Sequence, residues 1–559
     1  MAASRPEAAR TSNACQACRD KKVKCSGWPA EEDAHALLDI VVFNVGISQE
    51  LFDARAFSDN LSHVYLGSKS GADIPKLFVV DMCLVFAIGR LLQARPDANG
   101  DIPGTAFFKQ AMRQIPAIVD LRKHGILGVE VLALVALYLQ IIDHKEEAYL
   151  YSSSALRVAI SHGLHRTVPV SDRRRPEYVR RNRLWWSVYM QERRLCAAGG
   201  YPMSIADYAI DAPPLYDVAG YASVTAIVVN VRTARVTGQI TSTIYSQKDD
   251  TEIEFVTNVQ NILRSLHEIE STMPLEYSME LKSTGLLVAG RTFADAPGTI
   301  ARTSSGLYTS VYSAVIYTVR PILLYMARQH REAGGQQGTF NPALRRLAEI
   351  CVEAASKSIL ILQALQKREL LAKNAFLDLD ATFSAGFIFV LVEAINPGNT
   401  LGHRGIDGAR GILRYLVGLG NRVAATRLDE LNRMCQHLEL LLPPENTSPE
   451  QQRPPDRSDF EVLSRPFSFD IGFRSTVHGL LPRQDPYSDL APSAANTMQS
   501  PAEMMGFDQN YFGLNGADLA DIALEGNDYL YGVYHASDMP LTGVEQLDWE
   551  ILGNINFES

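Results

Sequence analysis

The sequence predicts an all-α protein. Apolar residues recur at spacings of three and four from about Leu77 to Leu442, the alternation typical of β-strands is hard to find there, and glycine or proline separates the periodic segments. With 559 residues, 46% of them hydrophobic, the chain is long enough for a large buried core. We therefore expect one large helical domain over residues 77–442, with a dozen or more packed helices and no repeat of fixed length.

The helices of this domain are predicted by individual periodic segments. Residues 106–119 and 148–164 each have apolar positions at helical spacing. The longest apolar run, Val129 to Ile142, contains Glu130 and is too short to cross a bilayer comfortably. We expect this run to be a buried helix, and we expect no membrane partner.

The N-terminus carries three cysteines, Cys15, Cys18 and Cys25, at C-x2-C-x6-C spacing. Cysteines separated by two residues can bind one zinc ion from a single turn. The residues between the second and third cysteines are mostly basic: Arg19, Lys21, Lys22 and Lys24. A short helix with these side chains points cations at an anion such as the DNA backbone. The segment therefore predicts both a metal and a nucleic-acid partner.

This motif resembles the first half of the fungal binuclear zinc-cluster transcription factors, whose signature C-R-x-x-K-x-K-C is matched from Cys18 to Cys25. In that family a second C-x2-C-x6-C half follows, and six thiolates hold two zinc ions. Here no cysteine occurs between Cys25 and Cys83, so this chain carries only half the ligands. Three thiols cannot close a tetrahedral site, and we expect residues 1–30 to be poorly ordered. A mispredicted splice junction and a natural isoform without DNA binding both remain open.

The centre of the chain resembles the regulatory region of the same family, the middle homology region. The matching pieces, in order, are Ala155–Ala159, Gly163–Arg166, Arg181–Trp186, Glu192–Arg193, Gly200–Pro202, Arg320–Pro321 and a C-x-x-A-A piece at Cys351. Glu192 stands where the family usually has Asp, and Tyr201 where it usually has Arg. Each piece is weak, but their order makes the set strong. The resemblance implies a helical regulatory domain without catalysis.

The residues of this region favour a structural interpretation over a ligand or nucleic-acid surface. Trp185 and Trp186 face different directions on a helix, so we expect one to anchor the core and the other a neighbouring helix. The neighbouring arginines are expected to cover aromatic faces and to pair with acidic groups. These arginines are Arg181, Arg183, Arg193 and Arg194.

Two other groups allow a functional reading beside a structural one. His162 and His165 are residues of a type that binds metal ions, but no third ligand accompanies them. A role in packing at a helix end is therefore favoured. The run from Arg173 to Arg175 is expected to be a solvated loop, with a nuclear-import patch as the alternative.

The last part of the chain changes in composition. Residues 443–559 begin with a Pro-rich linker, and after Arg483 there are thirteen acidic residues with no Lys or Arg. Aromatic and aliphatic residues are interspersed, which is typical of an acidic activation segment that stays largely disordered. A turn suited to a coactivator groove comprises Asp548, Trp549, Ile551 and Leu552. The alternative is a tail with no partner.

The expected organisation has four parts. They are a partial zinc-cluster DNA-binding segment (1–30), a linker or rearranged segment (31–76), the helical regulatory domain (77–442) and the linker with its acidic tail (443–559). The net charge is −10 although the N-terminus is basic, which suits a nucleic-acid end and an acidic interaction end. The seven cysteines show no disulfide framework, which favours a reducing compartment.

The leading hypothesis is a zinc-dependent, sequence-specific regulator of RNA polymerase II genes in a fungal nucleus. Family resemblance implies CGG-type half-sites, with Lys22 and then Lys21 contacting bases and with Arg19 and Lys24 holding phosphates. One alternative is a truncated regulator that acts through protein partners without DNA. Another is a helical sensor that binds an effector. An enzyme is not expected, because no phosphate loop, nucleophile elbow or metal triad occurs.

A homodimer is one further expected assembly. Members of this family often dimerise through a short coiled coil after the cluster. Residues 31–60 show no sustained heptads, so we expect that element to be missing or replaced here.

Overall fold

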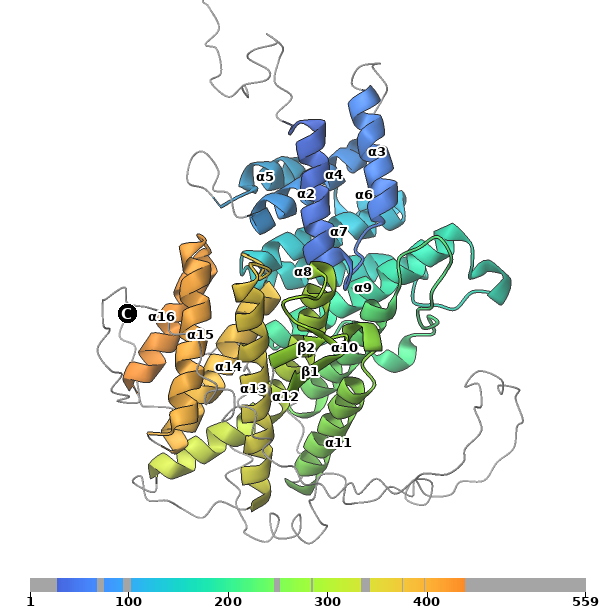
Figure 1. The fold of residues 1–559 in the computed structure, drawn as a ribbon. Coiled ribbons are helices and arrows are strands. Elements are labelled where there is room, and N and C mark those ends of the chain that lie inside the picture. Colours follow the sequence, from blue (N-terminus) through green and yellow to red (C-terminus); the bar gives the residue numbers. More distant parts are fainter. Residues whose placement is uncertain are drawn as a thin grey trace, which may run out of the picture.

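The computed structural model describes residues 28–67, 75–93, 102–245, 252–282, 285–332, 342–374, 376–396 and 398–437. Almost all regular structure in these residues is helical, which confirms the predicted fold class (Figure 1). The predicted zinc ligands and the acidic tail lie outside the described residues.

The first half of the described chain is entirely helical. Its elements are α2 (Glu31–Val41), the π-helical turn η1 (Val42–Gly46), α3 (Ala54–Gly67), α4 (Lys76–Gln93), α5 (Thr105–Gln114), α6 (Ile118–Leu121), η2 (Arg122–His124), α7 (Ile126–Ile141), α8 (Lys145–Ser161), η3 (Val170–Asp172), α9 (Pro176–Gly199) and η4 (Asp207–Ala209).

The second half contains the longest helices and one small sheet. Its elements are α10 (Thr225–Thr243), α11 (Glu252–Ser271), η5 (Leu275–Tyr277), β1 (Met279–Lys282), β2 (Gly285–Val288), β3 (Arg291–Thr292), α12 (Gly298–Glu332), α13 (Pro342–Lys367), α14 (Phe376–Ile395), α15 (Thr400–Gly418) and α16 (Arg422–His437). The three strands form an antiparallel meander in the order β1-β2-β3, with Met279 opposite Val288 and Leu287 opposite Thr292.

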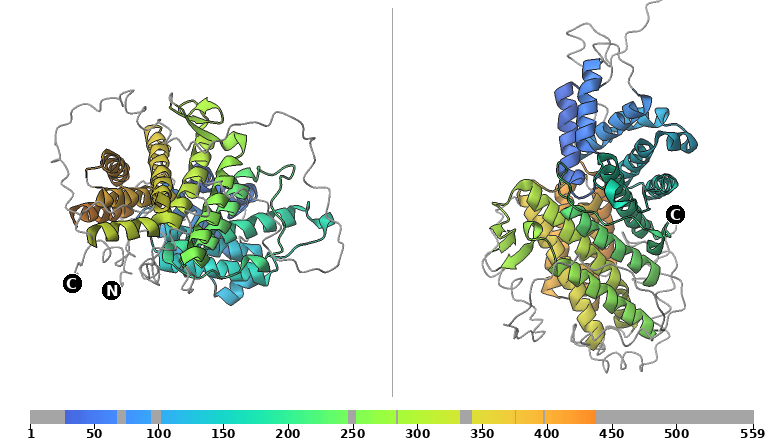
Figure 2. Two further views of the ribbon diagram at one scale, coloured as in Figure 1. Left: turned by 90° about the horizontal axis from the view of Figure 1, so that it is seen from below. Right: turned by 90° about the vertical axis from the view of Figure 1, so that its right-hand side faces the viewer.

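Two clusters of buried apolar side chains form the interior. One is built mainly by the helices from α2 to α9, and the other by the helices from α10 to α16. Helix α9 contributes Leu195 to the first cluster and Ala197 to the second, while α10 contributes Ala234 and Val236 in the same way. Two views show the first half stacked against the second (Figure 2). The two cores are therefore joined through α9 and α10.

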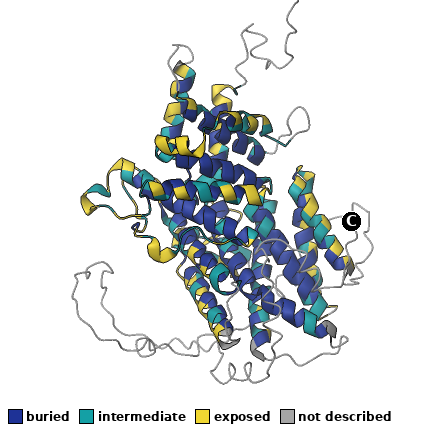
Figure 3. Cartoon of the chain, turned by 180° about the vertical axis from the view of Figure 1, so that it is seen from behind, coloured by how far each residue is buried: buried dark blue, intermediate teal, exposed yellow. Residues whose placement is uncertain are grey.

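Helix α7 is buried all round, as its continuous apolar sequence predicts. All of its residues from Gly128 to Ile141 are buried, including Glu130 and Gln140. A helix that is apolar on every side belongs in the middle of a protein or in a membrane, and Figure 3 shows dark blue residues concentrated in the inner helices. Cys83 of α4 also lies in the core, with its side chain 1% exposed.

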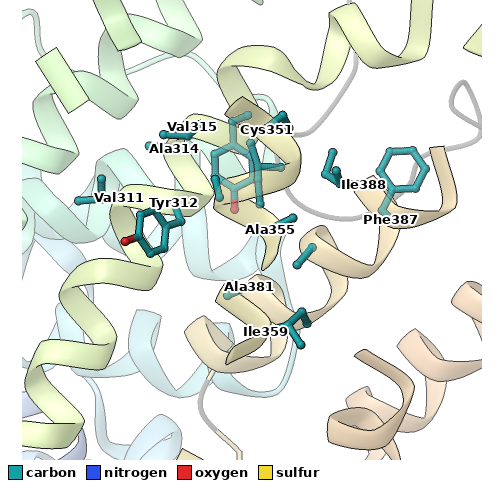
Figure 4. Close-up of a cluster of buried hydrophobic side chains, with 14 of the residues drawn as sticks. Val311, Tyr312, Ala314, Val315, Cys351, Ala355, Ile359, Ala381, Phe387 and Ile388 are labelled. Atoms are coloured by element: carbon teal, nitrogen blue, oxygen red, sulfur yellow. The ribbon is translucent and has the colours of Figure 1, made fainter. Parts of the chain in front are cut away.

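Helix α12 is the helix among the described residues that is long and apolar enough to cross a bilayer by length and composition. Its apolar window is 83% buried inside the protein, which is the property of a core helix. Helix α12 packs against α13 and α14, and Figure 4 shows part of the buried cluster that they share, with Val315 from α12, Cys351 from α13 and Phe387 from α14.

Proline inside α12 creates a local hydrogen-bonding problem that another element solves. Pro321 has no N–H, so the carbonyl of Tyr317 cannot receive the usual helical bond. The hydroxyl of Tyr245 donates to this carbonyl oxygen at 2.8 Å. The Arg320–Pro321 piece of the sequence is therefore tied to the end of α10.

The helical body begins earlier than the boundary at residue 77 that the sequence suggested. Acidic residues from Glu31 to Asp33 occupy the first turn of α2, where they complement the helix dipole. The same helix buries Leu37 and Val41 in the first core. Its start is fixed by Tyr65 of α3, whose hydroxyl donates to the Pro29 carbonyl at 2.8 Å. The segment expected to be a linker or rearranged thus contains two packed helices, because α2 and α3 are short and only half apolar.

Candidate functional site

The candidate functional site lies between α8 and α10, where most pieces of the sequence pattern meet. Helix α8 ends just before Gly163, and the Leu164 N–H donates back to the Ala159 carbonyl at 3.1 Å. The ring Nε2 of His162 lies 2.9 Å from the Arg122 carbonyl oxygen. Arg181 of α9 donates to the His162 carbonyl at 2.8 Å. The end of α8 is thus held by both η2 and α9.

Helix α9 has strong signals at both ends. Pro176 occupies its first turn, where a missing N–H costs no helical bond. Gly200 caps its C-terminus with a left-handed φ of 68°, a conformation that favours glycine. Tyr201 follows and stacks on Tyr149 of α8, with ring centroids 4.4 Å apart. The aromatic residue at this position therefore packs on α8, which explains why an uncharged side chain is accommodated there.

Both tryptophans of α9 are core residues. Trp185 is 0% exposed and Trp186 is 1% exposed, and both belong to the first core cluster. The Trp186 Nε1 donates to the Pro213 carbonyl at 3.0 Å, and Arg235 of α10 lies over its ring at 5.1 Å. Trp185 faces His165, with ring centroids 5.9 Å apart. The pair anchors α9 against both the core and the loop that follows it.

The centre of the site is a buried charged network on Arg193. This guanidinium is 1% exposed and donates to Glu192 Oε2 at 2.6 Å, to the Ile205 carbonyl at 2.7 Å and to Asp207 Oδ1 at 2.9 Å. The second oxygen of Glu192 accepts the Ser204 N–H at 2.5 Å. Charged groups can be buried when they are paired and hydrogen-bonded in this way. The network fastens the loop 200–212 to α9.

Tyr189 completes this network. Its hydroxyl donates to Asp207 Oδ1 at 2.8 Å, and Arg193 lies 4.5 Å over its ring. Burial raises the pKa of Tyr189, Asp207 raises it further, and Arg193 opposes the shift. Burial opposes the charge of Arg193, but Tyr189, Glu192 and Asp207 together raise its pKa. Arg193 stays cationic and Tyr189 stays a neutral donor, so the arrangement suits a structural clamp rather than proton transfer.

Two further arginines of α9 form ion pairs with distant elements. Arg180 donates to both oxygens of Glu130, at 2.8 Å and 2.9 Å, and Glu130 is 1% exposed. Arg183 donates to Glu50 at 2.8 Å and lies 5.2 Å over the ring of Tyr221. Of the four arginines singled out in the sequence, Arg183 and Arg193 pair with acids and lie over aromatic rings, as predicted. Arg194 instead donates to the side-chain oxygen of Gln49 at 2.7 Å.

The two histidines are used for packing. Burial lowers the pKa of His165, with Arg166 adding to the shift. Across the described parts of the chain, no group of three or more histidine, cysteine or acidic side chains is arranged to hold a metal. The four cysteines of this body, Cys83, Cys196, Cys351 and Cys435, are buried and free.

The residues predicted to bind zinc and DNA lie outside the described residues. They are Cys15, Cys18, Cys25, Arg19, Lys21, Lys22 and Lys24. The structure places Trp28 just after them, with its ring against Tyr65 at a centroid distance of 6.4 Å. The chain that leaves the cysteine motif is therefore attached directly to the helical body.

The fungal specific transcription factor domain matches residues 126–285, which run from α7 through the Arg193 network into the sheet. Its helices α7 to α11 include the tryptophan pair and the arginine ion pairs described above.

Curated relatives agree with this domain. The chain is 29% identical over 333 residues to an uncharacterized transcriptional regulatory protein of Schizosaccharomyces pombe, covering 57% of this chain and 39% of that protein. It is 22% identical over 377 residues to the thiamine repressible genes regulatory protein of the same yeast, covering 65% and 45%. It is 32% identical over 150 residues to a transcription regulator of Aspergillus niger, covering 26% and 18%. The chain thus spans less than half the length of these relatives. The description of the matched domain and the names of these relatives are those of transcription regulators.

Sequence reasoning missed several charged residues of this domain. Asp207 was not singled out, although it accepts from both Arg193 and Tyr189. Glu130 was noted only as an interruption of an apolar run, and Asp81 of α4 interrupts another apolar run in the same way. An acid inside an apolar helix was the available signal, because such a group needs a partner or a proton.

Proposed function

We propose that this chain is a zinc-dependent, sequence-specific DNA-binding regulator of RNA polymerase II transcription in a fungal nucleus. One observation carries the proposal: a basic C-x2-C-x6-C segment ends at Cys25, just ahead of a helical body that contains a fungal specific transcription factor domain. That combination places a segment suited to bind zinc and DNA directly before a helical regulatory domain.

Each residue of the basic segment has a distinct role in this proposal. Cys15, Cys18 and Cys25 are zinc ligands as thiolates, and they supply half of a two-zinc cluster. Lys22 and Lys21 donate to guanine O6 and N7 of CGG-type half-sites in the major groove. Arg19 and Lys24 neutralise phosphates and set the position of the helix on DNA. The four other cysteines of the chain are buried in the helical body, so in this proposal a second copy of the chain supplies the remaining thiolates.

A second candidate function keeps the regulator but removes DNA binding. The observation that favours it is the sequence after Cys25, which has no cysteine before Cys83 and forms α2 within the core. In this form the body and the acidic tail act through protein partners. The tail, with Trp549 and Leu552, offers apolar groups to a coactivator groove.

A gel-shift experiment on the full chain separates the two functions. The chain is titrated onto CGG-repeat duplex DNA and a scrambled duplex at one fixed salt concentration, with zinc and with a chelator. We expect zinc-dependent preference for the CGG duplex, and a loss of roughly 10-fold or more for Lys22→Ala because a base contact contributes about 1–3 kcal/mol. Lys109→Ala, on the exposed face of α5, is the matched control. Equal affinity for both duplexes, or a preference for the CGG duplex that persists in the presence of the chelator, refutes zinc-dependent recognition of the DNA sequence.

A reporter experiment tests the tail. The full chain is compared with the double variant Trp549→Ala/Leu552→Ala at a promoter where the wild-type chain increases transcription. We expect the variant to lose most of that increase at equal protein level, because the apolar contacts with the coactivator are removed. Unchanged reporter transcription in the double variant would show that these two tail residues do not bind a coactivator.

A further inference from the structure

A cavity of about 370 Å³ lies in the first half of the fold, away from the Arg193 network. It opens to solvent and is bordered by the segment before α3, by α3 and α4, and by the beginnings of α7 and α9. Its volume is in the range of small-molecule sites, which are concave and mostly apolar with a few placed polar groups. Three phenylalanines, Phe52, Phe57 and Phe78, line it.

Buried charged groups also line this cavity. Glu130 accepts hydrogen bonds from Nε and Nη2 of Arg180, so it has a cationic partner. Asp81 is 2% exposed, and its Oδ1 has no hydrogen-bond partner. A buried acceptor without a partner costs free energy unless a proton or a ligand satisfies it. A ligand bound in the cavity can therefore supply the hydrogen bond or ion pair that Asp81 lacks within the protein.

The sign of the charge indicates what this occupant is. Asp53, Asp81 and Glu130 face the cavity with one guanidinium, that of Arg180, so carboxyl groups outnumber the fixed cation by two. Asp53 already accepts N–H bonds at the start of α3, and the histidines that line the cavity, His63 and His124, are on its exposed side. Burial, followed by the charge of Glu130, raises the pKa of Asp81 well above its ordinary range, while Arg180 opposes the shift. An ammonium group in this cavity faces three carboxyl groups and is opposed by one guanidinium group.

We propose that this cavity binds a small organic cation with an aromatic or apolar body, its charged nitrogen at Asp81 and its body against Phe52, Phe57 and Phe78. Cations are attracted to aromatic faces as well as to carboxylates, so the phenylalanine rings and the acidic side chains of the cavity both favour a cationic ligand. The proposal concerns the helical body and stands whether or not the N-terminal segment reads DNA. It also gives the body a way to respond to a small molecule.

Three probes with the same indole body test the charge requirement. Tryptamine carries an ammonium group, tryptophol a hydroxyl group, and indole-3-propionate a carboxylate. Their affinities for the full chain are measured by isothermal titration calorimetry at one pH and salt concentration. We expect tryptamine to bind roughly 10-fold or more tightly than either other probe, a difference of about 1.4 kcal/mol. Equal affinities, a preference for either other probe, or no detectable binding of any probe overturns the proposal.

Two variants place the probe in the cavity. Asp81→Asn keeps the shape and removes the charge, so the preference for tryptamine should fall to within about 2-fold. Ala56→Phe, on α3, adds apolar volume to the lining of the cavity, leaves every carboxyl group in the sequence, and should weaken all three probes. Asp120→Asn, in the exposed helix α6, is the matched control and should leave every affinity unchanged. Retained preference in Asp81→Asn, or unchanged affinities in Ala56→Phe, shows that tryptamine binds elsewhere and refutes the proposal.

Discussion

At the residue scale, the buried charges of Arg193 and Glu130 are paired, whereas Asp81 is a buried acid with an unsatisfied oxygen. Arg193 is paired on several sides, and Glu130 is paired with Arg180. Asp81 has an oxygen without a partner. The physical rule is the same in each case, because an isolated charge loses its hydration on burial and must regain that free energy from a partner or give up its charge.

The acids around the cavity make stability depend on pH. Burial raises the pKa of Glu130 to about 7, although Arg180 opposes this shift, and it raises the pKa of Asp81 well above 3.8. A raised pKa means that the folded state binds protons more strongly than the unfolded state. The resulting stability is present below about pH 4 and is lost as the pH rises through 7. Thermal unfolding of the full chain should therefore show a melting temperature that falls between pH 5 and pH 8.

Asp81→Asn isolates one contribution to this curve. Asparagine resembles the protonated acid, so the variant should match the wild type near pH 5 and exceed its melting temperature at pH 8, by about 1–3 °C. Asp120→Asn serves as the control, since its side-chain bond with Lys123 lowers the pKa of Asp120 and the group stays ionised over this range. Parallel curves for Asp81→Asn and wild type would show that Asp81 is not held neutral in the fold.

The Arg193 network should be far more important for stability than a surface ion pair. Arg193→Ala leaves Glu192 buried without its partner, so we expect a loss of about 3–5 kcal/mol in the free energy of unfolding. Arg175→Ala breaks the exposed pair with Asp172 and should cost less than about 1 kcal/mol. Denaturant titration measures both. Similar losses for the two variants would assign the network no special structural role.

At the element scale, helix ends and helix defects decide how this body is assembled. Helix α9 begins at Pro176 and ends before Gly200, and loop 200–212 returns to its side through Asp207. In α15, Gly405 lies so close to Phe389 of α14 that an added Cβ would come within 2.1 Å of the ring. Small side chains and specific caps thus set how closely neighbouring helices approach.

The proline in α12 gives the sharpest test at this scale. Tyr245→Phe removes the hydroxyl that donates to the Tyr317 carbonyl and leaves that carbonyl without its replacement for the helical bond. We expect a loss of about 1–3 kcal/mol in the free energy of unfolding. Tyr216→Phe removes a hydroxyl that donates to the Arg173 carbonyl at the surface, where water replaces it, and should cost much less. Equal costs in denaturant titrations would mean that Pro321 leaves no unsatisfied group in α12.

At the scale of the whole molecule, the sequence predicted the interior better than the connections. Periodicity alone identified the helical class, and the apolar run at α7 was predicted to be a buried helix because burial follows composition. The ion pairs were not predictable, since Arg180 and Glu130 are 50 residues apart and only the packing of α7 on α9 brings them together. Helix α2 was missed because its apolar stripe is short, and its burial depends on α4.

The joining of the two cores predicts cooperative unfolding of the helical body. Helices α9 and α10 contribute to both clusters, so neither half can open without exposing apolar surface of the other. Leu84→Ala in α4 and Leu391→Ala in α14 each remove a fully buried side chain from one cluster, and each should cost about 2–5 kcal/mol. Both variants should lower the same single calorimetric transition, whereas Leu150→Ala, at a side chain that is 62% exposed, should not move it. Two transitions, each lowered by only one of the core variants, would show that the halves unfold as independent units despite the shared helices.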